Sequence, residues 1–127
     1  MGKIENMNLL PFLLPVVMLV VFIAVRRIGL VKAVEARGLL RNGAQVIDVR
    51  NRSEFRARHL PQAVSMPVDT IEAVATERLG DRNQALLLHC QSGVRSGMAR
   101  KKLRALGYTR VYNLGSYDRA SRIVGGA

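Results

Sequence analysis

The sequence has 127 residues, enough for one domain of ordinary size and too few for a multi-domain enzyme or a multi-span transporter. Its hydrophobic content of 49% excludes a disordered chain, and its one cysteine excludes a disulfide framework or a metal site built on paired thiolates. The net charge of +11 favours anionic partners, but three Tyr, three Phe and no Trp argue against a nucleic-acid partner. With two histidines besides the single cysteine, we expect no metal site.

The chain begins with a tail, residues 1–8, followed by an uncharged stretch, residues 9–25, that would measure about 26 Å as a helix. No polar face interrupts this stretch, which predicts a transmembrane helix over residues 9–27 and a lipid bilayer as a partner. Basic residues, Arg26 and Arg27 among them, are more numerous after the stretch than before it. This charge distribution predicts a single-pass protein of the plasma membrane with a cytoplasmic domain. A cleaved signal peptide, which would leave the domain in the periplasm, is the alternative.

The remaining chain divides into a linker or short helical stem, residues 28–37, and a domain, residues 38–127. Within the domain, short apolar stretches alternate with segments of helical periodicity, and residues after Gly115 show no usable pattern. Strands are predicted at 46–49, 63–66, 85–89 and 111–113, and helices at 53–58, 69–79 and 96–106. The alternation predicts an α/β fold, with a small, mainly parallel sheet flanked by helices on both faces.

Cys90 stands at the carboxyl end of the predicted strand at 85–89, and a helix follows the loop after it. Loop amides and a helix N-terminus can surround an anion at this place in an α/β sheet. Gly93 lets the backbone approach closely, and Arg95 adds a permanent positive charge. These features predict a pKa of Cys90 below that of a free thiol, and therefore a nucleophile. A lone cysteine acting as a small buried hydrophobic residue is the alternative.

The order and spacing of several motifs resemble the rhodanese family over about residues 38–118. The first half of the domain is represented by Ile47-Asp48-Val49-Arg50, Glu54-Phe55, His59-Leu60 and Ala63-Val64-Ser65-Met66-Pro67, the active-site loop by Cys90 to Gly97, and the closing helix and strand by residues 105–108 and 111–115. Within the family, the chain is most similar to the short single-domain thiosulfate sulfurtransferases of the bacterial phage-shock type, which also begin with a hydrophobic segment. The resemblance thus implies a bacterial inner membrane as the location.

This resemblance implies a sulfurtransferase that needs no cofactor. Cys90 would take sulfane sulfur from thiosulfate or a persulfide donor, hold it as a persulfide, and pass it to cyanide or a thiol. A sulfur-relay protein is a further expected partner. The loop residues expected to bind substrate, mainly through their backbone, are Gln91, Ser92, Gly93, Val94, Arg95 and Ser96, and Arg50 is a candidate pocket residue.

Two other functions use the same fold. The first is a catalytically idle module that binds a protein partner near the membrane, which the intact cysteine–glycine–arginine loop disfavours. The second is a phosphatase, whose loop has one more residue than the four between Cys90 and Arg95. The loop also lacks a basic residue at its second or third position, which favours a persulfide carrier supplied by a partner protein.

Overall fold

A four-stranded sheet forms the centre of the protein, in a computed structural model that describes residues 7–126. The strands are β1 (Gln45–Asp48), β2 (Val64–Ser65), β3 (Leu86–His89) and β4 (Val111–Gly115). They lie in the order β2-β1-β3-β4, and each neighbouring pair is parallel. The predicted α/β fold with a mainly parallel sheet is therefore confirmed.

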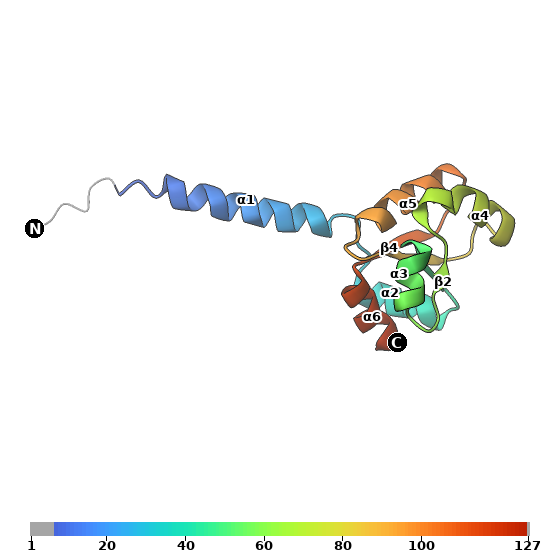
Figure 1. Ribbon diagram of the computed structural model, residues 1–127. Coiled ribbons are helices and arrows are strands. Elements are labelled where there is room, and N and C mark those ends of the chain that lie inside the picture. Colours follow the sequence, from blue (N-terminus) through green and yellow to red (C-terminus); the bar gives the residue numbers. More distant parts are fainter. Residues whose placement is uncertain (1–6, 127) are drawn as a thin grey trace, which may run out of the picture.

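Helices cover both faces of this sheet (Figure 1). One face packs against α2 (Ala33–Arg41) and α6 (Tyr117–Gly125), and the other packs against α4 (Ile71–Arg78) and α5 (Val94–Ala105). The remaining elements of the domain are the short helix α3 (Arg52–Ala57) and the 3-10 turn η1 (Val68–Thr70). Helices on both faces leave the carboxyl ends of the strands as the open edge where a site can form.

Alternate residues of the inner strands enter two separate hydrophobic cores. In β1, Val46 belongs to the core beneath α2 and α6, whereas Ile47 belongs to the core beneath α4 and α5. In β3, Leu87 faces the first core, and Leu86 and Leu88 face the second. All five side chains are at most 2% exposed, which explains the continuous apolar stretches in the sequence. This burial also fixes the strand register, because a slip of one residue would exchange the two faces.

The structure differs from the prediction at the start of the domain. Residues 33–37, which the sequence analysis assigns to the linker, belong to helix α2. Ala36 is fully buried, and Val31 is 6% exposed, and both join the core beneath α2 and α6. The folded domain therefore begins before residue 38.

A second difference lies at the C-terminal end, where α6 occupies the region without predicted structure. Ser116 caps this helix, since its hydroxyl accepts a hydrogen bond of 3.1 Å from the Arg119 N–H. Tyr117, Ala120 and Ile123 lie on one buried face of the helix. Their spacing of three residues is helical, but it spans too few turns to stand out in the sequence.

Helix α1 (Leu10–Arg27) extends away from the α/β domain (Figure 1), and its apolar side chains are exposed. Among residues 7–126, no helix combines the length and the apolar character that a bilayer crossing requires. The transmembrane helix predicted over residues 9–27 is therefore not confirmed.

Candidate active site

Cys90 follows β3, one of the two inner strands of the sheet. Its backbone N–H donates to the carbonyl of Gly115, at the end of β4, over 3.2 Å. The Tyr117 N–H, at the start of α6, donates to the carbonyl of Gln91 over 3.3 Å. Main-chain contacts to β4 and α6 thus hold the loop at the edge of the sheet where α/β proteins bind ligands.

Hydrogen-bond donors surround the thiol of Cys90. The Gly93 N–H donates to Sγ at 2.9 Å, and the Ser96 hydroxyl lies 3.5 Å from Sγ. Burial alone raises the pKa of this thiol. Hydrogen bonds from the Ser96 hydroxyl and from the N–H groups of Ser96, Gly93 and Ser92 outweigh burial, so the pKa lies below the ordinary value of a cysteine. The loop therefore stabilises a thiolate.

Gly93 can hold this position because it has no side chain. Its φ of +96° lies in the left-handed region, which other residues rarely adopt. A Cβ placed on Gly93 would lie 3.2 Å from the Cα of Gly115. Glycine therefore provides both the turn into α5 and the close packing of the loop against β4.

Asn113, on β4, holds the loop through its side-chain amide. Its Oδ1 accepts a hydrogen bond from the Gly115 N–H (2.8 Å), and its Nδ2 donates to the Gly93 carbonyl (3.1 Å). The Ser96 hydroxyl, whose single proton can point either to Cys90 Sγ or to Asn113, lies 2.7 Å from the same Oδ1. These partners fix the orientation of the amide. The sequence did not lead us to expect Asn113 at the site, although a polar side chain within a buried strand is a signal of such a role.

Arg95 forms an ion pair with Glu54 of α3. Its Nη1 and Nη2 donate to the two carboxylate oxygens over 2.6 and 3.0 Å. Hydrogen bonding to Arg95 lowers the pKa of Glu54 to about 2, and hydrogen bonding to Glu54 raises the pKa of Arg95. Arg95 therefore ties the loop to α3, and the carboxylate offsets its charge.

Arg50, predicted as a pocket residue, lies buried beside Asp48. Its Nη2 donates to Asp48 Oδ2 at 2.7 Å and to the Arg58 carbonyl at 2.6 Å, and hydrogen bonding to Asp48 raises the pKa of Arg50. The buried ring of His89 points its Nε2 toward the same carboxylate over 3.7 Å. The guanidinium of Arg50 is thus engaged by the protein itself.

The other loop side chains differ in their exposure. Gln91, Ser92 and Val94 are exposed, whereas Ser96 is fully buried. Cys90 is also fully buried, so a substrate reaches its sulfur only when the atoms covering it move apart. Within residues 7–126, no cluster of three or more His, Cys, Asp or Glu side chains could hold a metal ion.

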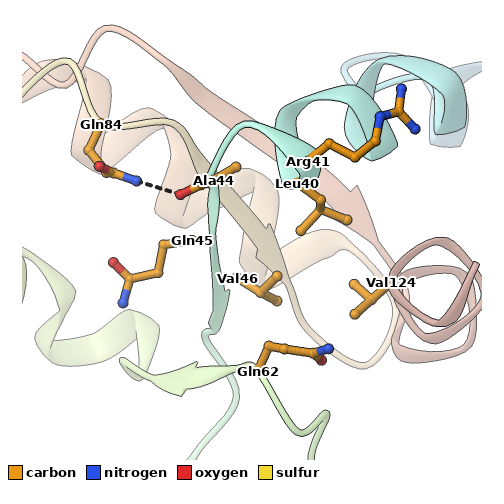
Figure 2. A pocket seen from close by; sticks show the side chains of 9 residues that line it. Leu40, Arg41, Ala44, Gln45, Val46, Gln62, Gln84 and Val124 are labelled. Carbon is orange, nitrogen blue, oxygen red and sulfur yellow. Dashed lines mark hydrogen bonds between the residues drawn. The ribbon is translucent and has the colours of Figure 1, made fainter. Parts of the chain in front are cut away.

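A cavity of about 640 Å³ lies at the opposite end of the sheet, where β1 begins (Figure 2). Gln45, Gln62 and Gln84 line it, and Gln84 Nε2 donates to the Gly43 carbonyl over 3.1 Å. Arg41 is the one ionisable side chain in its lining. This cavity therefore offers neither a nucleophile nor an acid, and the chemistry belongs to the Cys90 loop.

Comparison with known proteins agrees with this geometry. A family model described as "Rhodanese-like domain" matches residues 32–120. The chain belongs to the rhodanese family. Members of this family are sulfurtransferases, and the match includes the whole loop of this rhodanese domain, from Cys90 to Ser96.

Named relatives match parts of this rhodanese chain. It is 39% identical over 71 residues to "Uncharacterized protein YqhL" of Bacillus subtilis, covering 56% of the chain and 55% of that protein. It is 30% identical over 69 residues to "Thiosulfate sulfurtransferase PspE" of Escherichia coli, covering 54% of the chain and 66% of that protein. The solved structure titled "Human Single Domain Sulfurtranferase TSTD1" is 30% identical, with a TM-score of 0.62, over 74% of this chain and 96% of that one. The chain thus spans less than two thirds of these two bacterial relatives.

Proposed function

We propose that the protein is a sulfurtransferase that carries sulfane sulfur as a persulfide on Cys90. The observation that carries this proposal is the set of hydrogen-bond donors around the thiol, contributed by Ser92, Gly93 and Ser96, which lowers its pKa. A lowered pKa increases the fraction of thiolate at neutral pH without a separate general base. The name of the relative PspE supports thiosulfate as a donor.

In the first half-reaction, the Cys90 thiolate attacks the outer sulfur of thiosulfate. A new S–S bond forms to Cys90 while the S–S bond of thiosulfate breaks, and sulfite leaves with the electron pair of that bond. The negative charge moves to the outer sulfur of the persulfide, and the N–H groups of the loop stabilise it there. With a persulfide donor, the leaving group is the donor's thiolate.

In the second half-reaction, an acceptor thiolate or cyanide attacks the outer sulfur of the persulfide. The S–S bond to Cys90 breaks, and the thiolate of Cys90 returns to its hydrogen-bond donors. The products are an acceptor persulfide or thiocyanate, and no external oxidant is required. The hydrogen-bond donors of the loop serve both half-reactions, because the Cys90 thiolate and the persulfide are both anionic at sulfur.

The charges around the loop favour a donor that needs little electrostatic attraction. Gln91 and Ser92 are uncharged, and Glu54 offsets the charge of Arg95 at 2.6 Å. A protein persulfide, delivered by direct contact, fits these surroundings alongside thiosulfate. The exposed side chain of Val94 adds an apolar contact beside the loop for such a sulfur-relay partner.

The proposal is tested by a thiosulfate:cyanide assay of the full chain and of its Cys90→Ser variant. We expect thiocyanate formation by the first and none above background by the second. Mass spectrometry after thiosulfate treatment should show one added sulfur atom on Cys90. Equal rates in both proteins, without the added sulfur, would reject the enzyme and leave the idle binding module.

For location, we propose that α1 attaches the protein to a bilayer with the rhodanese domain on the cytoplasmic side. The exposed apolar side chains of α1 and the arginines that follow them support this proposal. The test is co-sedimentation of the full chain with lipid vesicles, compared with a Leu14→Lys/Val21→Lys variant. Equal sedimentation of the two would reject it. A mature chain that lacks residues 1–25, when isolated from cells, would indicate a cleaved signal peptide.

A further inference from the structure

A second cavity, of about 410 Å³, is lined by residues of α3, β2 and α4. Arg52 and Arg56 of α3 line it together with Arg78, from the last turn of α4. No residue of the loop from Cys90 to Ser96 lines this cavity, so it is separate from the sulfur-transfer site. Its volume falls within the range of about 300–1,000 Å³ found for small-molecule sites.

The three arginines of this cavity have no counter-charge among the residues that the structure describes. Some other exposed cations of the domain are paired, for example Arg58 with Asp118 and Lys102 with Glu72. Within the part of the chain that the structure describes, the guanidinium groups of Arg52, Arg56 and Arg78 form no ion pair, hydrogen bond or aromatic contact. Like charges four residues apart on a helix, as in α3, are destabilising. An anion would remove this repulsion.

The rest of the wall combines apolar side chains with hydroxyl groups. Phe55, Pro67 and Val74 supply apolar surface, and the Phe55 ring is held in place by stacking on His59 with centroids 4.0 Å apart. The hydroxyl of Ser65, another lining residue, is buried and has no hydrogen-bond partner. A buried polar atom without a partner is uncommon in folded proteins. The Ser65 hydroxyl is therefore a hydrogen-bonding group in a wall that is otherwise partly apolar. The cavity therefore suits a ligand with both anionic and apolar parts.

We propose that this cavity binds a phosphorylated organic molecule. Guanidinium groups bind phosphate through paired N–H···O hydrogen bonds, and a phosphate carries up to two charges against the three of Arg52, Arg56 and Arg78. The organic part packs against Phe55 and Val74. This site is independent of the persulfide chemistry, because none of its lining residues belongs to the Cys90 loop or donates a hydrogen bond to the Cys90 thiol.

Binding is tested by NMR titration of the full chain at low salt with three probes: inorganic pyrophosphate, adenosine diphosphate and adenosine. Pyrophosphate and adenosine diphosphate should saturably shift the side-chain signals of Arg52, Arg56 and Arg78, with several-fold tighter binding of the nucleotide. Adenosine should not saturate. If pyrophosphate leaves these signals unchanged, or if the nucleotide binds no more tightly than pyrophosphate, the proposal is overturned.

Two charge-matched variants separate this site from the general positive charge of the protein. Arg52→Gln/Arg78→Gln should weaken nucleotide binding at least about tenfold, because each substitution removes charge-assisted hydrogen bonds to the phosphate. Arg110→Gln/Arg122→Gln removes the same charge from exposed positions outside the cavity and should change binding little. Without an anion, the first variant should be at least as stable as the parent chain. Equal weakening of nucleotide binding by both variants would overturn the proposal. The thiosulfate:cyanide activity should be unchanged in both variants, so the test of sulfur transfer stays separate from the test of this cavity.

Discussion

Glu54 and Arg95 lie 41 residues apart, yet hydrogen bonds of 2.6 and 3.0 Å join their side chains. The same carboxylate caps α3, because Glu54 Oε1 accepts a hydrogen bond from the Asn51 N–H over 3.2 Å. One side chain thus fixes both the start of α3 and the first turn of α5. The helix after β1 and the loop after β3 are joined at the edge of the sheet that carries the nucleophile.

This ion pair predicts how stability changes in acid. The pKa of Glu54 is lowered to about 2, so its stabilising contribution is complete above its ordinary pKa of about 4.5 and is lost as the pH falls toward 2. Glu54→Gln should lower the free energy of unfolding at neutral pH by about 1 kcal/mol or less, because the pair is partly exposed. Urea unfolding should show a shallower loss of stability in acid for this variant than for the parent chain. The control is Glu77→Gln, an exposed carboxylate of α4; parallel curves for Glu54→Gln and the parent would contradict the prediction.

Ser96→Ala should raise the pKa of Cys90, because it removes the hydroxyl donor beside Sγ. The N–H groups of Ser92 and Gly93 remain, so we expect a decrease in thiosulfate:cyanide activity of about tenfold near neutral pH rather than complete loss. The rate of Cys90 alkylation by iodoacetamide, followed against pH, measures the change in pKa directly. Ser53→Ala, at an exposed position of α3, is the control. An unchanged alkylation profile would show that the main-chain N–H groups alone set the pKa.

Gly93→Ala should destabilise the domain and abolish persulfide formation. It imposes a side chain at a φ of +96° and places its Cβ 3.2 Å from the Cα of Gly115, so the N–H that donates to Sγ must move. We expect a loss of about 1–3 kcal/mol in the free energy of unfolding. Gly43→Ala is the matched control, because Gly43 has a φ of +91° but nothing within 4 Å of its Cβ. A larger loss for Gly93→Ala than for Gly43→Ala isolates the contact with Gly115, and equal losses would refute its importance.

The sequence was sufficient to predict the features that depend on local pattern. The strands at β1 and β3 are continuous apolar stretches because both faces of the sheet are covered, and Val46 to Asp48 and Leu86 to His89 are buried throughout. The placement of Cys90 at a strand end follows from this pattern together with the helix after Gly93. The family resemblance over the same motifs agrees with the match to residues 32–120.

Contacts between distant residues could not be predicted in this way. Nothing local to Glu54 or Arg95 indicates that the two meet, and Asn113 is separated from Gly93 by 20 residues. The helix predicted at the N-terminus forms over almost the expected residues, Leu10–Arg27, whereas its membrane-spanning character is not confirmed. Long-range pairing is set by the folded chain, and a local sequence pattern does not contain it.

Burial of His89 predicts a second pH dependence of the free energy of unfolding, at higher pH than the one that Glu54 causes. Its ring is fully buried, its Nδ1 lies 3.3 Å from the Cys90 carbonyl, and its Nε2 lies 3.7 Å from Asp48 Oδ2 without a hydrogen-bond partner among the described residues. Burial lowers the pKa of His89; the nearby Asp48 opposes this, whereas the positive charge of Arg50 adds to it. The ring of Tyr117, packed edge-on at 5.6 Å, completes the enclosure. The neutral ring is therefore the native form.

Because the folded pKa of His89 lies below its ordinary value, the unfolded chain binds more protons as the pH falls below about 6.5, and stability decreases. The loss should approach about 1.4 kcal/mol for each pH unit below this point. His89→Gln keeps an amide that can donate to the Cys90 carbonyl but cannot titrate, so its free energy of unfolding should change less between about pH 6.5 and 5. His59 is present in both proteins, and the difference between their urea-unfolding profiles therefore isolates His89. Superimposable profiles would mean that the buried ring accepts a proton as readily in the folded protein as in the unfolded chain.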